Sequence, residues 1–246
     1  MYSLSQFTLS EMTECGAALR KLGAGVSTME ETANNIVRYF YDQFLDIDTH
    51  ESAIALVRFF KTHSYDRLPT DLKQRVQQIL NTDDVPADLR CLMLLGTAGD
   101  RPEWNTRHQS TAHQVIPLAS ASMVRQAPMI SQLIKQLGLT IDSVIAPDPD
   151  MIVDLQERTY NVFHIPNALG SPYIPAQKNF VEPCGIQSVL GFGGILPSGN
   201  LITTVMFSKV SIKRDTAELF KPLALNTKMA ILPFDQGAVF TPVSIS

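Results

Sequence analysis

The sequence predicts a mixed α/β (α+β) domain in which one sheet carries helices on its faces. Two segments near the N-terminus have helical periodicity and begin with capping boxes. Several short apolar runs, rich in β-branched and aromatic residues, follow them and are typical of buried strands. The last two runs flank a Pro-Ser-Gly-Asn turn at 197–200, so they predict a hairpin.

The two N-terminal helices are predicted from their caps. Thr8 with Glu11 opens an amphipathic segment that lasts until Gly23, with the spacing of a packing or dimerisation stripe. Ser27 with Glu30 opens a longer helix whose apolar face is wide enough to cover a sheet. That face comprises Met29, Ala33, Ile36, Val37, Phe40, Tyr41 and Phe44.

The next segments predict two strands with a helix between them. Compact apolar runs at 54–60 and 91–95 predict the strands, and the second ends in a turn around Gly96, Gly99 and Asp100. The helix is predicted at 71–80. Its inward side chains are Leu72, Val76, Ile79 and Leu80.

The middle of the chain is less regular. Segment 100–118 is polar and has no clear period, so it predicts a long loop of the kind that often carries function. Pro128 suits the first turn of a helix that Gly138 closes, and another short helix is predicted after Pro149.

The C-terminal third predicts more of the sheet and a closing helix. Apolar runs predict strands at 160–165, 186–191 and 201–207. Asp215 supplies an acidic helix start, and the apolar face that continues to Ile231 predicts one closing helix.

Composition excludes several classes of protein. The 20 basic and 24 acidic residues are interspersed, so the net charge of −4 provides no patch for gripping nucleic acid. No run approaches the ~18 apolar residues of a spanning helix, and the N-terminus does not look like a signal peptide, so we expect a cytoplasmic protein without a membrane partner. The three cysteines are far apart and form no CxxC motif, which argues against a disulfide framework or zinc site.

The order of these elements resembles the GAF fold of bacterial signalling proteins. The ending carries most of the likeness: GIQSVLG at 185–191, a P-x-G turn at 197–199, an apolar strand at 201–208 and a closing helix at 215–230. The match covers residues 27–234, with an enlarged middle insertion at 100–158. Residues 1–26 then form an N-terminal helix and residues 235–246 a tail. The whole chain is also similar to N-terminal input regions that precede PAS or histidine kinase modules.

The resemblance implies a central antiparallel sheet flanked by helices, with a small-molecule pocket on one sheet face. It also implies a homodimer joined through the terminal helices and a signalling partner such as a kinase. The cyclic-nucleotide motif of one GAF subfamily is not evident, and no cysteine stands in a bilin-attachment context. The resemblance therefore assigns no cofactor.

Candidate ligand contacts fall into two groups. Trp104, Arg107 and His113, with His108 nearby, gather aromatic, cationic and imidazole groups that suit a pocket lid or a clamp for an anion. The alternative is a solvated loop anchored by its tryptophan. His108 and His113 lack the i, i+4 spacing of paired helical metal ligands.

The second group lies in the proline-rich region that would wrap a GAF-like pocket: Tyr160, His164, Tyr173 and Cys184. His164 is the first candidate for a ligand contact, with a haem iron ligand as a minor branch and a hydrogen-bonded packing residue as the alternative. Cys184, between Pro183 and Gly185, is a candidate for redox chemistry.

These observations favour a non-catalytic regulatory sensor that binds a small ligand or partner and relays the signal through its terminal helices. One alternative is a ligand-free GAF-like scaffold that acts by dimer or partner contacts. The other is a small enzyme that uses His164, His113 or Cys184, although no GxSxG, HExxH or EF-hand motif is present.

Overall fold

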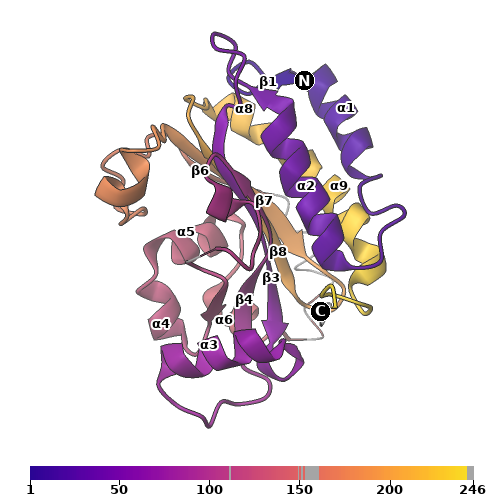
Figure 1. Cartoon of the computed structure of the whole chain (residues 1–246), viewed down its shortest axis with the longest axis vertical. Coiled ribbons are helices and arrows are strands. Elements are labelled where there is room, and N and C mark those ends of the chain that lie inside the picture. Colours follow the sequence, from indigo (N-terminus) through magenta and orange to yellow (C-terminus); the bar gives the residue numbers. More distant parts are fainter. Residues whose placement is uncertain (111, 149, 151, 153–160, 243–246) are drawn as a thin grey trace.

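The computed structural model describes residues 1–110, 112–148, 150, 152 and 161–242. Its centre is a six-stranded antiparallel sheet with the order β5-β4-β3-β8-β7-β6 (Figure 1). The strands are β3 (Ile54–Ser64), β4 (Arg90–Gly99), β5 (Val115–Pro117), β6 (Val162–Ile165), β7 (Ser188–Ile195) and β8 (Leu201–Ser208). A short parallel pair, β1 (Tyr2–Ser3) and β2 (Phe44–Leu45), lies outside this sheet.

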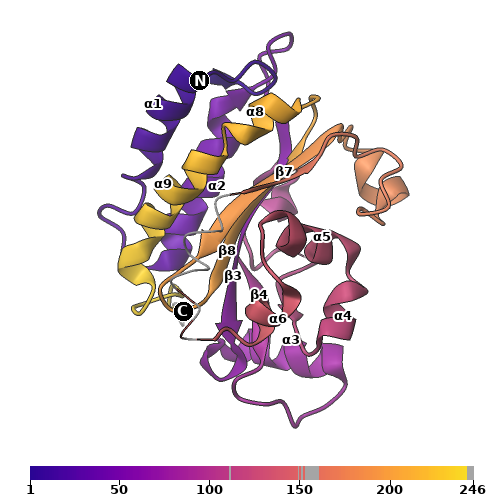
Figure 2. The same cartoon turned by 180° about the vertical axis from the view of Figure 1, so that it is seen from behind.

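One face of the sheet is covered by a layer of helices in which α1, α2 and α9 lie side by side (Figures 1 and 2). Its members are α1 (Leu9–Leu19), α2 (Met29–Gln43), α3 (Thr70–Leu80), α8 (Arg214–Glu218) and α9 (Lys221–Ile231). Aromatic rings join the helices to the sheet: the Phe40 and Phe192 centroids are 5.4 Å apart, and those of Phe192 and Phe220 are 5.8 Å apart. Such buried rings contribute a large share of a core's stability.

The opposite face is covered by shorter elements. These are α4 (Ala121–Arg125), α5 (Pro128–Gln136), α6 (Ile141–Ile145) and a π-helical turn, η4 (Gln177–Val181) (Figure 2). Short 3₁₀ turns occur at η1 (Tyr65–Arg67), η2 (Pro102–Trp104) and η5 (Leu232–Phe234). The predicted sheet with helices on its faces is confirmed, because apolar clusters fill both sides of it.

The first capping box is confirmed, whereas the second was placed one residue too early. Thr8 and Glu11 cap α1 reciprocally. The N-cap of α2 is Thr28, whose Oγ1 accepts from the Glu31 amide at 3.2 Å, while the Glu31 carboxylate accepts from the Thr28 amide at 3.3 Å. Because Glu31 and not Glu30 completes the capping box, the buried Glu30 carboxylate is able to form an ion pair with Arg107.

The two central strands are longer than predicted. Gly96 and Gly99 belong to β4 rather than to a turn. A Cβ at Gly96 would lie 2.7 Å from the carbonyl oxygen of Ala33 in α2, so the glycine allows the helix to approach the sheet closely. The helix predicted at 71–80 is confirmed as α3, but Ile79 is half exposed because α3 packs only its Leu72 and Val76 face.

The C-terminal predictions were partly right. The hairpin of β7 and β8 is confirmed, with Gly199 at φ +76° in its turn. The single closing helix is wrong: the chain breaks after Glu218 into α8 and α9, and Pro222 lies in the first turn of α9. Proline removes an amide donor and favours a helix start, which explains the interruption.

The predicted long loop at 100–118 contains η2 and ends in the edge strand β5. The helix predicted from Pro128 is confirmed as α5. The helix predicted after Pro149 lies largely outside the described residues.

Candidate functional site

A cavity of about 530 Å³ lies on the sheet face covered by α5. Strands β3 and β8 form its floor, α5 forms one wall, the segment 174–180 forms another, and part of the 100–118 loop completes it. Most of the lining is apolar or aromatic, with Phe60, Met129 and Phe207 among its members. A concave apolar cavity of this size with few polar groups is typical of small-molecule sites.

Arg58 is the charged residue of the cavity lining. It projects from β3, and its side chain is 7% exposed. Nη2 donates to Ser110 Oγ at 3.1 Å, and Nη1 contacts the Ala112 carbonyl oxygen and His113 Nδ1, both at 3.4 Å. Among the described residues, Nε has no hydrogen-bond partner and no carboxylate forms an ion pair with the guanidinium.

Burial lowers the pKa of Arg58 to about 10, so the guanidinium is still protonated at neutral pH. In the described structure its neighbours are a hydroxyl, a carbonyl and an imidazole, and none of them cancels the positive charge. A buried cation in this setting stabilises an incoming anion more strongly than an exposed one does.

His113 lies beside Arg58 at the exposed edge of the cavity. Its backbone is left-handed, with φ +61°, which is uncommon for a residue other than glycine. Desolvation at the cavity wall and the Arg58 charge lower the pKa of His113, so its ring is neutral at pH 7. Nδ1 then accepts from Arg58 rather than competing with it as a second cation.

Trp104 is buried and forms part of an aromatic wall. Its ring meets Phe180 edge to face at 5.7 Å between centroids, and Phe180 meets Phe207 in the same manner at 4.9 Å. The Arg101 guanidinium lies over the indole, 4.7 Å from its centroid. Trp104 is thus held within the core of this face, which supports the predicted anchoring role and places its ring against the cavity.

Arg107 does not reach the cavity. Its Nε donates to Glu30 Oε1 at 2.5 Å, and both side chains are buried. The second Glu30 oxygen accepts from the Thr241 amide at 3.0 Å, and the Arg107 guanidinium lies 5.6 Å from the centroid of Phe240. The loop therefore joins α2 to the C-terminal segment through Arg107, whose charge Glu30 already compensates.

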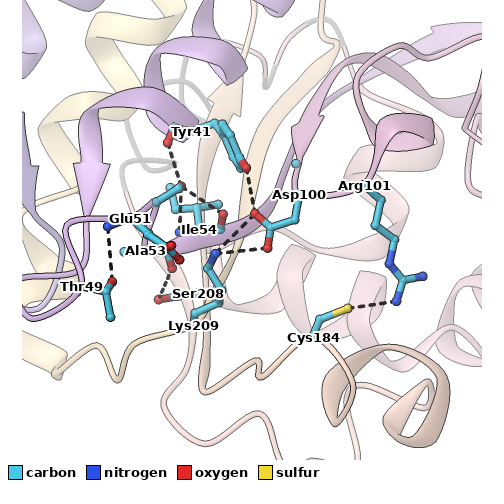
Figure 3. A network of polar contacts seen from close by, with 12 residues as sticks. Tyr41, Thr49, Glu51, Ala53, Ile54, Asp100, Arg101, Cys184, Ser208 and Lys209 are labelled. Atoms are coloured by element: carbon cyan, nitrogen blue, oxygen red, sulfur yellow. Dashed lines mark hydrogen bonds and ion pairs between the residues drawn. The ribbon is translucent and has the colours of Figure 1, made fainter.

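The start of this loop is fixed by Asp100 (Figure 3). Tyr41 Oη donates to Asp100 Oδ1 at 2.8 Å, and Lys209 Nζ lies 3.1 Å from Oδ2. Desolvation and the Asp100 carboxylate raise the pKa of Tyr41 to about 12. The ends of α2, β4 and β8 are thereby tied together where the loop leaves the sheet.

His164 and Tyr173 line a second, shallower hollow of about 340 Å³. His164 is buried, and its Nε2 donates to the Ile212 carbonyl oxygen at 3.0 Å in the neutral tautomer that this contact requires. Burial lowers its pKa. Because Nε2 is engaged by the backbone, the geometry matches the packing alternative better than a haem ligand.

Cys184 is half-buried, and Arg101 Nη2 lies 3.4 Å from its Sγ (Figure 3). No hydrogen bond joins any two of His113, His164 and Cys184 in the described structure, although the enzyme alternative needs two of them to converge. Tyr160 lies outside the described residues. Trp104 and His113 are therefore the sequence candidates that meet at the larger cavity.

Sequence reasoning missed Arg58, Met129 and Phe180. A signal for Arg58 was present, because it is the one charged residue in the run IALVRFF, which otherwise reads as a buried strand. In the described parts of the chain, no cluster of three or more His, Cys, Asp or Glu side chains is arranged to hold a metal ion. None of the described helices combines the length and apolar character needed to cross a bilayer.

Comparisons with known proteins leave the family open. No family model matches the chain, and no curated protein sequence matches it. Among solved structures, free methionine-R-sulfoxide reductase from Neisseria meningitidis, in complex with its substrate, is 11% identical with a TM-score of 0.47, over 94% of this chain and 95% of the other. The GAF domain of a phosphoenolpyruvate-protein phosphotransferase from Coxiella burnetii is 11% identical with a TM-score of 0.43, over 92% and 94%.

The six-stranded antiparallel sheet, with helices on both faces and a hairpin that leads into the closing helices, has the architecture that the resemblance of the sequence predicts.

Proposed function

We propose that this chain is a non-catalytic regulatory module of the bacterial cytoplasm that binds a small molecule in the cavity between the sheet and α5. This proposal rests on the cavity, which has a volume of about 530 Å³, apolar walls and a few polar residues in its lining, Arg58 among them. Cavities with this composition fix a ligand's orientation through their polar groups and hold it through their apolar walls.

The 100–118 loop supplies a route from the cavity to the C-terminal segment. Trp104 and His113 line the cavity, whereas Arg107 of the same loop holds Glu30, which accepts from the Thr241 amide. The first amides of α2 also donate to this segment: Met29 to the Ala238 carbonyl at 3.0 Å and Glu30 to Val239 at 2.9 Å. A ligand that favours one position of the loop would therefore favour one position of the C-terminal segment.

The test is native mass spectrometry of the chain purified from its own host. We expect a bound small molecule in the wild type and its loss in Met129→Trp, which places a larger ring at the cavity wall. Met229→Trp is the matched control, because Met229 is 48% exposed on α9. Circular dichroism checks that both variants fold. Equal retention by the two variants, or no retained mass and no thermal stabilisation by any tested metabolite, would contradict the proposal.

The scaffold remains a second candidate because α9 presents apolar side chains to solvent. Leu225 is 44% exposed and Met229 is 48% exposed, and α9 packs beside α1. A homodimer through these terminal helices would cover such side chains. Light scattering tests this candidate: a dimer that Leu225→Glu converts to a monomer supports it, and a wild-type monomer at micromolar concentration opposes it.

A further inference from the structure

Arg58 has a positive charge that the described structure does not compensate. Arg107 provides the internal comparison: both guanidinium groups are buried, but Arg107 pairs with Glu30, whereas Arg58 contacts neutral groups. An unpaired buried charge is strongly unfavourable, and proteins normally place a counter-ion or a ligand against it. The position of Arg58 in the cavity lining makes a ligand able to fill this role.

The weakly held donors of Arg58 suit a small anion. Nε–H is buried without a partner among the described residues, and the two Nη1 contacts are long, at 3.4 Å. A carboxylate accepts charge-assisted hydrogen bonds from a guanidinium, and such bonds are shorter and stronger than the contacts that Nη1 makes here. We infer that the ligand of the proposed sensor is a small molecule with one carboxylate on an apolar body, and that Arg58 binds the carboxylate. This inference rests on the proposed function.

The rest of the cavity argues for a single charge. His113 beside Arg58 is neutral at pH 7, and the other polar side chains of the lining, Gln126 and Thr203, carry no charge. A dianion such as a phosphate monoester would need a second cation that this lining does not supply. The aromatic group of Trp104 and Phe180 faces the remainder of the ligand and favours an aliphatic or aromatic body.

Calorimetric titration of the full chain with matched acid and amide probes tests the charge directly. The pairs are decanoate with decanamide and 4-phenylbutanoate with 4-phenylbutanamide, which differ in charge but hardly in shape. A hydrogen bond to a charged group exceeds a neutral one enough to predict that at least one acid binds about tenfold or more tightly than its amide.

Three variants locate the effect. Arg58→Met should abolish the preference for the acid and leave amide binding within about twofold, because the apolar walls are unchanged. Arg58→Lys keeps the charge without the planar fork and should retain part of the preference. Arg75→Met, at an exposed position of α3, is the control and should behave as the wild type.

The outcomes separate this inference from the proposed function. Acid and amide binding with equal affinity, or a preference that survives Arg58→Met, would overturn the carboxylate assignment and leave a small-molecule pocket standing. If neither acids nor amides bind the wild type, the pocket proposal fails and the carboxylate assignment fails with it. Loss of the acid preference in Arg58→Met alone, with amide binding intact, supports both.

Discussion

Two buried arginines show how side-chain surroundings decide function at the residue scale. Arg107 is paired with Glu30 at 2.5 Å and contributes to the structure, whereas Arg58 faces a cavity with neutral neighbours. Removing one member of a buried ion pair leaves the other charge uncompensated and destabilises the fold. Breaking the pair of Arg107 and Glu30 should therefore lower stability, whereas removing the charge of Arg58 should not.

We expect Glu30→Gln to lower the free energy of unfolding by about 3 kcal/mol, because it leaves Arg107 buried without a counter-ion. Arg58→Met should leave stability unchanged or raise it, since it removes an uncompensated charge. Urea denaturation of both variants measures the difference. If Glu30→Gln were neutral while Arg58→Met unfolded the protein, the assignment of these roles would be reversed.

Two of the candidate residues chosen from the sequence line the cavity. These are Trp104 and His113, whereas Arg107 lies beyond its wall. An irregular loop has no period from which side-chain directions could be read, so neighbours in sequence can face opposite sides. Arg58 was missed because the strand was recognised from its apolar residues alone.

At the element scale, the N-terminus of α2 joins three parts of the chain. Thr28 caps the helix, its hydroxyl also lies 3.1 Å from that of Thr241, and Glu30 receives Arg107 from the loop. The capping box predicted at Ser27 and Glu30 has the right residue types, but Thr28 and Glu31 offer the same types one residue later. The local sequence pattern does not distinguish the two possible N-caps, whereas the packing of α2 on the sheet determines which residue begins the helix.

A pair of alanine substitutions distinguishes these two registers. Thr28→Ala should lower the free energy of unfolding by about 1 kcal/mol through loss of the cap. Ser27→Ala should change it by less than about 0.5 kcal/mol, because no side-chain contact of Ser27 supports the helix in the described part of the chain. Chemical denaturation reads both values, and a larger effect at Ser27 would mean that the register is wrong.

The contact between α2 and β4 gives a second test at this scale. Gly96→Ala should cost about 1–3 kcal/mol, because its Cβ would overlap the Ala33 carbonyl. Gly237→Ala is the matched control, since the nearest described atom to its Cβ would be 3.8 Å away. Thermal unfolding of the two variants should separate clearly, and equal melting temperatures would show that α2 does not approach β4 this closely.

At the scale of the whole molecule, the sheet and its two layers could be predicted because apolar runs and helical faces report burial directly. The break between α8 and α9 and the edge strand β5 were missed. The break follows from Pro222, which starts α9, whereas β5 depends on a distant segment: it pairs with β4 through Cys91 and Pro117, which local periodicity does not encode. The cavity depends on the same long-range packing.

Buried histidines make the stability of the fold depend on pH. Burial and the nearby Lys61 charge lower the pKa of His63 to about 3, and burial also lowers the pKa of His164. In the unfolded chain these histidines have a pKa near 6.5. Below that pH the unfolded chain binds protons that the folded chain does not bind, so the free energy of unfolding falls as pH falls.

Urea denaturation should therefore show a loss on the order of 2 kcal/mol from His63 between pH 6.5 and 5. His63→Gln should remove this contribution. If the free energy of unfolding changed with pH equally in His63→Gln and the wild type, His63 would not be buried as a neutral ring.

Amide hydrogen exchange with and without decanoate tests the regulatory pocket, because it reports on the cavity and the C-terminal segment in one experiment. We expect increased protection at the cavity wall in α5 and a simultaneous change at residues 238–241, both absent in Arg58→Met. Unchanged exchange at both places, in a sample saturated with any probe that binds, would contradict a regulatory pocket on this face of the sheet.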